Sequence, residues 1–92
     1  MPVAVVFNVP GMSAQQYDQI IAGLEGRGEG SPDGRLAHVA APADGGWMVF
    51  DVWESEEKFG RFAEVLMPIV AGAGVNPPPQ PRVYPVHSFV GG

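Results

Sequence analysis

The stretch WMVFDVWESEEKF, residues 47–59, joins a run of aromatic and β-branched residues directly to a helix start. Residues 47–53 predict a strand, because such side chains pack well on a pleated, half-buried surface. Ser55 stands in the N-cap position, and Glu56 and Glu57 follow in the first turn, where the helix dipole favours negative charge. The stretch therefore predicts a strand that leads straight into a helix.

Apolar runs separated by Gly and Pro predict the other elements on both sides of this stretch. They are, in chain order, a strand over Val3–Val9, a helix from the Ser13 cap to Gly26–Gly28, a strand over Arg35–Ala41, the helix from Ser55 to Gly72–Gly74 and a strand over Arg82–Val90. Asp44 and Gly45 form the centre of a predicted hairpin turn. Pro85 predicts an edge position or a bulge for the last strand, since proline cannot donate to the ladder.

The order strand, helix, strand, strand, helix, strand is typical of a ferredoxin-like βαββαβ unit. We expect one α+β domain over residues 1–92, in which a four-stranded antiparallel sheet carries two helices on one face. The other face of such a sheet normally alternates apolar with polar residues if it meets water.

The strands of this chain are too apolar on both faces for one of them to meet water. The first strand presents Val3, Val5, Phe7 and Val9 on one face and Ala4, Val6 and Asn8 on the other, and the third presents Met48, Phe50 and Val52 against Trp47, Val49, Asp51 and Trp53. Because a large apolar patch usually marks an interface, we expect a homodimer with its sheets face to face. A larger hetero-complex, or a ligand-filled cavity in a monomer, would also cover such a surface.

The composition excludes several classes of partner. A net charge of −5 disfavours nucleic acid and anionic membrane surfaces, both of which need a basic face. The absence of cysteine removes thiolate metal sites and fits a reducing cytoplasm. The N-terminal run reads as a strand rather than a signal peptide, and no apolar stretch approaches the roughly 20 residues of a membrane helix. We therefore expect a cytoplasmic protein.

The candidate catalytic residues are Asn8, Asp51, His38 and His87. Asn8 and Asp51 interrupt apolar strands, where a buried amide or carboxylate needs a hydrogen-bonding partner. An arginine (Arg35 or Arg82) or a histidine would pair with Asp51. Each of the four also has a structural interpretation: a strand-end cap, an ion pair or a packed strand histidine. Two histidines without a third ligand do not make a metal site, so we expect none.

The candidate ligand-binding residues are Trp47, Trp53, Phe50, Tyr17 and Tyr84. Such aromatic residues wall a flat pocket in some proteins, but at strand spacing they more often form plain core. The sequence lacks a nucleophile elbow, a phosphate loop, a dinucleotide fingerprint and an HExxH motif. The Ser55-x-x-Lys58 spacing is explained by the N-cap role of the serine.

The segment Asp51–Phe59 resembles the strand-to-helix signature of the dimeric α/β-barrel superfamily, in particular its antibiotic-biosynthesis monooxygenase-like members. The resemblance implies a homodimer, with a cavity between sheet and helices in each subunit. It also implies kinship with cofactor-free oxygenases of polyaromatic substrates, haem-degrading oxygenases and many proteins of unassigned function. Residues 59–64 lack the helical histidine of the haem-degrading branch, and only Asn8 has a counterpart there, so no cofactor is expected.

Two functions from different classes follow. The first is a small cofactor-independent monooxygenase or isomerase acting on a small apolar or aromatic ligand. The alternative is a non-catalytic dimeric protein that binds a small ligand or responds to stress. The enzyme hypothesis requires that two or more of the four candidate catalytic residues point into one cavity, whereas scattered positions would count against it.

Overall fold

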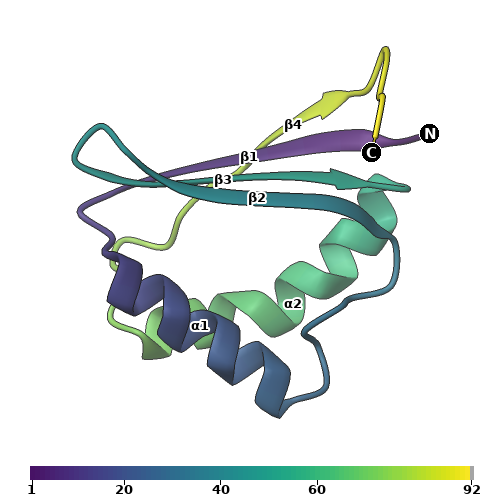
Figure 1. Cartoon of the computed structure of the whole chain (residues 1–92). Helices are drawn as coiled ribbons and strands as arrows, with labels where there is room; N and C mark the ends of the chain where they lie inside the picture. The colour runs from purple at the N-terminus through teal and green to yellow at the C-terminus, as the bar shows by residue number, and fades with distance from the viewer. Residues whose placement is uncertain (92) are drawn as a thin grey trace.

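The computed structural model describes residues 1–91 as a layer of strands over a layer of helices (Figure 1). The elements are β1 (Val3–Pro10), α1 (Ala14–Gly26), β2 (Arg35–Ala43), β3 (Gly46–Trp53), α2 (Glu56–Gly72) and β4 (Arg82–Pro85). This order confirms the predicted βαββαβ arrangement.

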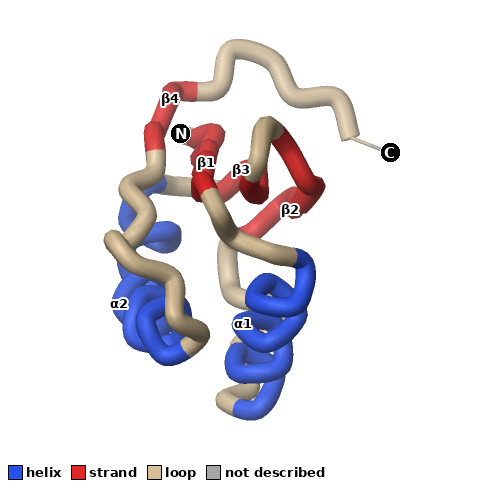
Figure 2. The backbone as a smooth tube through the Cα atoms, turned by 90° about the vertical axis from the view of Figure 1, so that its left-hand side faces the viewer, coloured by secondary structure: helices blue, strands red, loops and turns tan. Residues whose placement is uncertain are grey.

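The sheet has the strand order β2-β3-β1-β4, and every neighbouring pair runs antiparallel. Both helices lie on the same side of it, as Figures 1 and 2 show from two directions. The ferredoxin-like α+β fold is therefore confirmed. We call the side of the sheet turned away from the helices the open face.

The last strand is shorter than the sequence predicted. β4 lies at an edge of the sheet, as Pro85 indicated, but it ends at that residue instead of continuing to Val90. Proline has no backbone N–H to extend the ladder, and only the Val86 N–H still bonds to the Pro2 carbonyl, at 3.0 Å. The following segment then arches over the open face (Figure 2).

Both helices begin where their caps predict. The Ser13 hydroxyl accepts a hydrogen bond from the Gln16 N–H at 3.1 Å, and the Gln16 side-chain oxygen accepts one from the Ser13 N–H at 3.0 Å. This reciprocal pair is the predicted capping box. The Ser55 hydroxyl caps α2 by accepting from the Lys58 N–H at 3.2 Å.

The core lies between the helices and the strand residues that face them. Val5 and Trp53 are completely buried there. The Trp53 ring meets Phe59 and Phe62 of α2 at centroid distances of 5.7 and 5.2 Å. Aromatic contacts of this kind dominate the burial energy of a small core, so they fix α2 against β3.

A β-bulge interrupts β2 close to its start. Arg35 pairs with Trp53 and Ala37 pairs with Val52, so that Leu36 is an extra residue on this strand. Residues three apart in a regular strand lie on opposite faces of the sheet. Because of the bulge, Arg35 and His38 both lie on the helix side.

Candidate functional site

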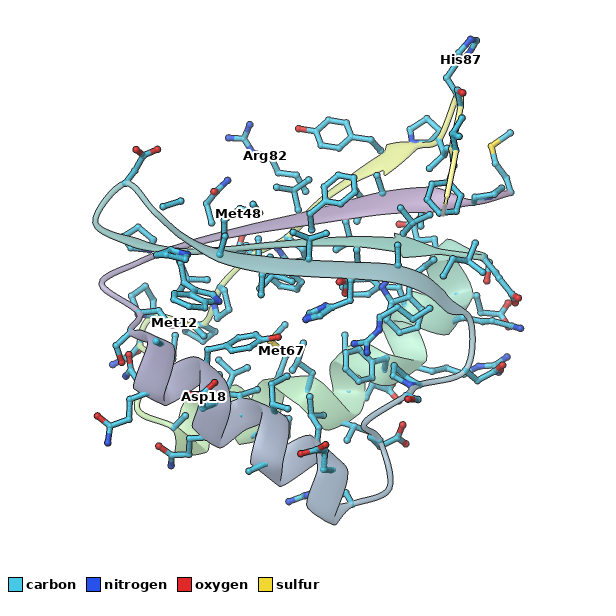
Figure 3. The ribbon with its side chains drawn as sticks, in the orientation of Figure 1. Met12, Asp18, Met48, Met67, Arg82 and His87 are labelled. Carbon is cyan, nitrogen blue, oxygen red and sulfur yellow. The ribbon has the colours of Figure 1, made fainter. Side chains whose placement is uncertain are left out.

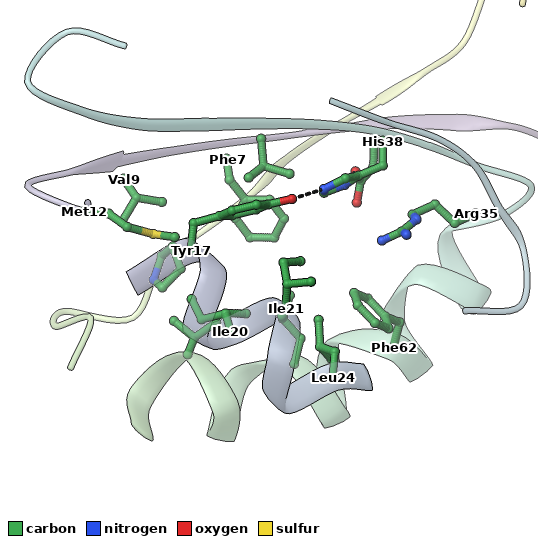
Figure 4. A pocket seen from close by; sticks show the side chains of 15 residues that line it. Phe7, Val9, Met12, Tyr17, Ile20, Ile21, Leu24, Arg35, His38 and Phe62 are labelled. Carbon is green, nitrogen blue, oxygen red and sulfur yellow. Dashed lines mark hydrogen bonds and ion pairs between the residues drawn. The ribbon is translucent and has the colours of Figure 1, made fainter. Parts of the chain in front are cut away.

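A small cavity lies between the sheet and the helices, with a free volume of about 60 Å³ (Figure 4). Its walls are mostly apolar and come from both helices and from the three strands β1, β2 and β3. The polar side chains that line it are Tyr17, Arg35, His38 and Asp51.

Asp51 is a buried carboxylate in the middle of β3, with its side chain only 4% exposed. The His38 Nδ1–H donates to its Oδ1 at 2.6 Å, and the Trp53 indole N–H donates to its Oδ2 at 3.3 Å. His38 and Asp51 are direct partners in the β2–β3 register. The partner of Asp51 is thus a histidine, one of the predicted alternatives, and neither Arg35 nor Arg82 takes this position.

His38 connects this carboxylate to the cavity. An ionised carboxylate only accepts hydrogen bonds, so the His38 Nδ1 carries the proton and Nε2 is left with a lone pair. The Tyr17 hydroxyl lies 2.7 Å from that Nε2 and donates to it (Figure 4). The result is a continuous relay of hydrogen bonds from Tyr17 through His38 to Asp51, steadied by Trp53.

Tyr17 reaches His38 from the first turn of α1. Burial raises the pKa of its phenol above the usual value, and the negative charges of Asp51 and Asp18 add to this, while the Arg35 charge opposes it. The phenol therefore keeps its proton at neutral pH and acts as the donor. Its ring stacks against Trp47 at a centroid distance of 5.3 Å.

Six of the nine predicted site residues do not line this cavity, and four of these six lie on the open face or beyond β4. Asn8 and Phe50 belong to the open face, because the helix side of β1 and β3 carries their odd-numbered residues. Tyr84 of β4 pairs with Ala4, on the same open face, and is 47% exposed. His87 follows β4 and points away from the sheet and helices (Figure 3). Of the four candidate catalytic residues, the structure brings together His38 and Asp51.

The two tryptophans have separate positions. Trp53 belongs to the buried core, where its indole N–H orients the Asp51 carboxylate. Trp47 supports the Tyr17 ring, and its buried indole N–H has no hydrogen-bond partner in the described part of the chain. Neither of the two tryptophans lines the cavity itself.

Arg35 is the polar cavity residue that was not predicted as a site residue. Regular strand alternation assigns Arg35 and His38 to opposite faces, and only the bulge brings both to the helix side. Nothing in the local sequence marks that bulge. Tyr17 was predicted as an aromatic wall residue, and its hydrogen bond to His38 follows only from how α1 packs on the sheet.

Residues 1–91 contain neither a metal-binding cluster of side chains nor a membrane-spanning helix. No group of three or more His, Asp or Glu side chains in this range is arranged to hold a metal ion. Within the same range, no helix is both long enough and apolar enough to cross a membrane.

Solved structures with this arrangement of elements are described as monooxygenases or oxygenases. A protein from Chloroflexus aurantiacus J-10-fl, assigned to the antibiotic biosynthesis monooxygenases, matches with a TM-score of 0.66 and 19% identity over 98% of each chain. The ActVA-Orf6 monooxygenase of Streptomyces coelicolor, solved with the ligand nanaomycin D, matches with a TM-score of 0.61 and 22% identity over 99% of this chain and 92% of its own. The chain has the antibiotic biosynthesis monooxygenase-like fold.

A third solved structure with this fold is a mutant of SnoaB, a cofactor-independent oxygenase from Streptomyces nogalater. It matches with a TM-score of 0.61 and 12% identity over 97% of this chain and 94% of its own. No family model and no curated protein matches the sequence. Sequence identities this low support a shared fold and nothing more, so the function has to follow from the residues of the cavity.

The raised pKa of Tyr17 gives a direct test of its burial. In a Tyr84→Phe variant Tyr17 is the one remaining tyrosine, and its phenolate absorbance near 295 nm should develop above pH 10, the usual midpoint of a phenol. The folded chain then holds this proton more tightly than the unfolded chain, so its contribution to stability is lost as the pH rises past 10. A midpoint below 10 in the folded variant would contradict the buried hydrogen bond.

Proposed function

We propose that the protein binds a small, mostly apolar molecule in the cavity and that His38 removes a proton from it. The observation that carries this proposal is the relay at the cavity wall, with His38 Nδ1–H on Asp51 at 2.6 Å and Tyr17 O–H on Nε2 at 2.7 Å. A histidine whose tautomer is fixed by a buried carboxylate is well suited to general-base catalysis.

His38 acts as the base through its Nε2 atom, which accepts the hydrogen bond from Tyr17. A ligand with an acidic C–H or O–H bond displaces the phenol from Nε2 and places its own proton there. The imidazolium that forms lies directly against the Asp51 carboxylate, which is held in place by Trp53 and stabilises the new charge. A positioned general base typically accelerates proton transfer by about 10² to 10⁴-fold.

The size of the cavity limits the ligand. An engineered apolar cavity of about 150 Å³ takes up benzene, whereas the free volume here is about 60 Å³. Even a ligand with one ring therefore needs wall side chains to move. Tyr17 leaves when its hydrogen bond is exchanged, and Met12, another wall residue, has three rotatable bonds that let it repack.

Proton removal is the step that an isomerase and a cofactor-independent oxygenase have in common. SnoaB and ActVA-Orf6 have the same fold and are an oxygenase and a monooxygenase, which supports oxygenation as the overall reaction. In that reaction dioxygen is the oxidant. When a deprotonated methylene is converted to a carbonyl, one oxygen atom enters the product and the other leaves as water, so no cofactor is needed for balance.

One observation favours a second function, ligand binding without chemistry. The relay is complete within the chain itself, since Tyr17, His38 and Asp51 satisfy one another. Buried polar networks of this kind also serve to specify a unique core. A protein that binds a ligand beside this network and leaves it intact would show no proton transfer.

The catalytic function and the binding function predict different results in a deuterium-exchange experiment. The probe is indan-2-one, a ketone with activated methylene groups on one aromatic ring, incubated with the protein in D₂O and followed by proton NMR. We expect exchange faster than in buffer, and a loss of about 10² to 10⁴-fold of that acceleration in His38→Gln. His87→Gln is the matched control and should exchange at the wild-type rate, because His87 is exposed and lies outside the cavity.

Binding of indan-2-one without accelerated exchange would contradict the catalytic function and support ligand binding without chemistry. An equal loss in His38→Gln and His87→Gln would show that the base is not His38. If indan-2-one neither binds nor exchanges, the proposed function is wrong in both of its forms.

We also propose that the open face is covered by a second copy of the chain. Val39 is 50% exposed there and pairs across the sheet with Phe50, and Met48 projects from the same side (Figure 3). Few charged groups interrupt this surface, and Arg82 of the edge strand β4 is the exception (Figure 3). A self-complementary apolar face is the usual basis of a two-fold dimer.

Light scattering after size exclusion measures this assembly. The wild type should have twice the 9.7 kDa mass of one chain, and Val39→Glu should lower it to a single chain by placing a charge in the apolar face. Ala22→Glu, on the exposed side of α1, is the control and should keep the larger mass. A wild-type mass of one chain would contradict the dimer.

A further inference from the structure

Arg35 places a permanent positive charge at the wall of an apolar cavity. Its guanidinium nitrogens are turned into the space between His38 and Phe62 (Figure 4). Its side chain makes one hydrogen bond within the described chain, a long one of 3.3 Å to the Gly30 carbonyl. A guanidinium has five N–H donors and stays charged at all physiological pH values, so most of its donors are available to a ligand.

The carboxylates of the protein do not neutralise this arginine. The ion pairs of residues 1–91 involve His38, Lys58 and Arg61, and none of them includes Arg35. Asp51 is the one carboxylate that lines the cavity, and it is engaged by His38 and Trp53. In a chain with a net charge of −5, an unpaired arginine at a cavity wall is an exception that points to an anionic ligand.

The bulge in β2 is the structural device that brings the arginine to this position. If β2 ran regularly through Leu36, with no bulge, Arg35 would lie on the open face while His38 faced the cavity. Bulges are common beside functional sites, where they re-aim a side chain. This bulge places the guanidinium of Arg35 and the imidazole of His38, the proposed base, on the same wall of the cavity.

We propose that Arg35 is a specificity-determining residue and that the ligand of the cavity is a one-ring organic carboxylate. The guanidinium binds the carboxylate through two parallel N–H···O bonds, the geometry for which arginine is suited. The apolar ring then lies against Ile21, Leu24 and Phe62, with its reactive bond toward His38. This proposal rests on the ligand-binding function proposed above and adds the charge of the ligand.

The test compares two probes of the same shape, sodium benzoate and the neutral benzamide, in ¹H–¹⁵N NMR titrations. The wild type should bind benzoate at least about tenfold more tightly, as expected for a charge-assisted pair. Arg35→Gln should lower benzoate affinity by about tenfold or more and change benzamide affinity by less than about threefold. Arg27→Gln, an exposed arginine at the end of α1, removes the same charge and should leave both affinities unchanged.

Arg35→Lys keeps the charge but loses the planar fork, so its preference for benzoate should be smaller than in the wild type. This variant decides the question if Arg35→Gln does not fold, and an undiminished preference in it would overturn the role of the fork. Equal binding of the two probes by the wild type overturns the role of Arg35 but leaves the ligand-binding function standing. If neither probe binds at millimolar concentration, this inference fails, and the binding of indan-2-one decides separately whether the ligand-binding function stands.

Discussion

The hydrogen bond between His38 and Asp51 is the interaction on which the site depends. A carboxylate in the interior of a sheet costs several kcal/mol unless it is paired and hydrogen-bonded. In this chain the register of β2 and β3 places His38 directly opposite, and Trp53 donates a second bond from two residues along. Because these bonds fix the tautomer of His38, they also determine which nitrogen faces the cavity and what Tyr17 can bind.

The position of Tyr17, whose hydroxyl is hydrogen-bonded to His38, explains the small volume of the cavity. Tyr17 fills space with its ring and satisfies His38 with its hydroxyl, so the unliganded protein buries no unpaired atom at the base. A ligand has to offer both an apolar body and a group that replaces the phenol. In the proposed function the relay would select ligands by chemistry as well as by shape, and Arg35 would add selection by charge.

The fold was predictable because its signals are local. The Ser13 and Ser55 caps, the Asp44-Gly45 turn and the strand compositions all act within a few residues. Apart from the shorter β4, the elements lie where the sequence indicated. The site was predictable only in part. Asp51 and His38 were recognised as polar exceptions in strands, but Asn8 shows the same pattern and lies on the opposite face. The faces are set by packing against the helices, which apolar residues on both sides of the strands do not reveal.

Long-range ¹H–¹⁵N NMR of the imidazole rings, recorded at pH 8, tests this account most directly. It predicts that His38 is protonated on Nδ1 and unprotonated on Nε2, and that Asp51→Asn, which can no longer act as a purely accepting partner, weakens this preference. His87, which is exposed, provides the comparison within the same spectrum. A His38 ring protonated on Nε2 in the wild-type protein would contradict the account, because neither the Asp51 bond nor the base facing the cavity would then exist.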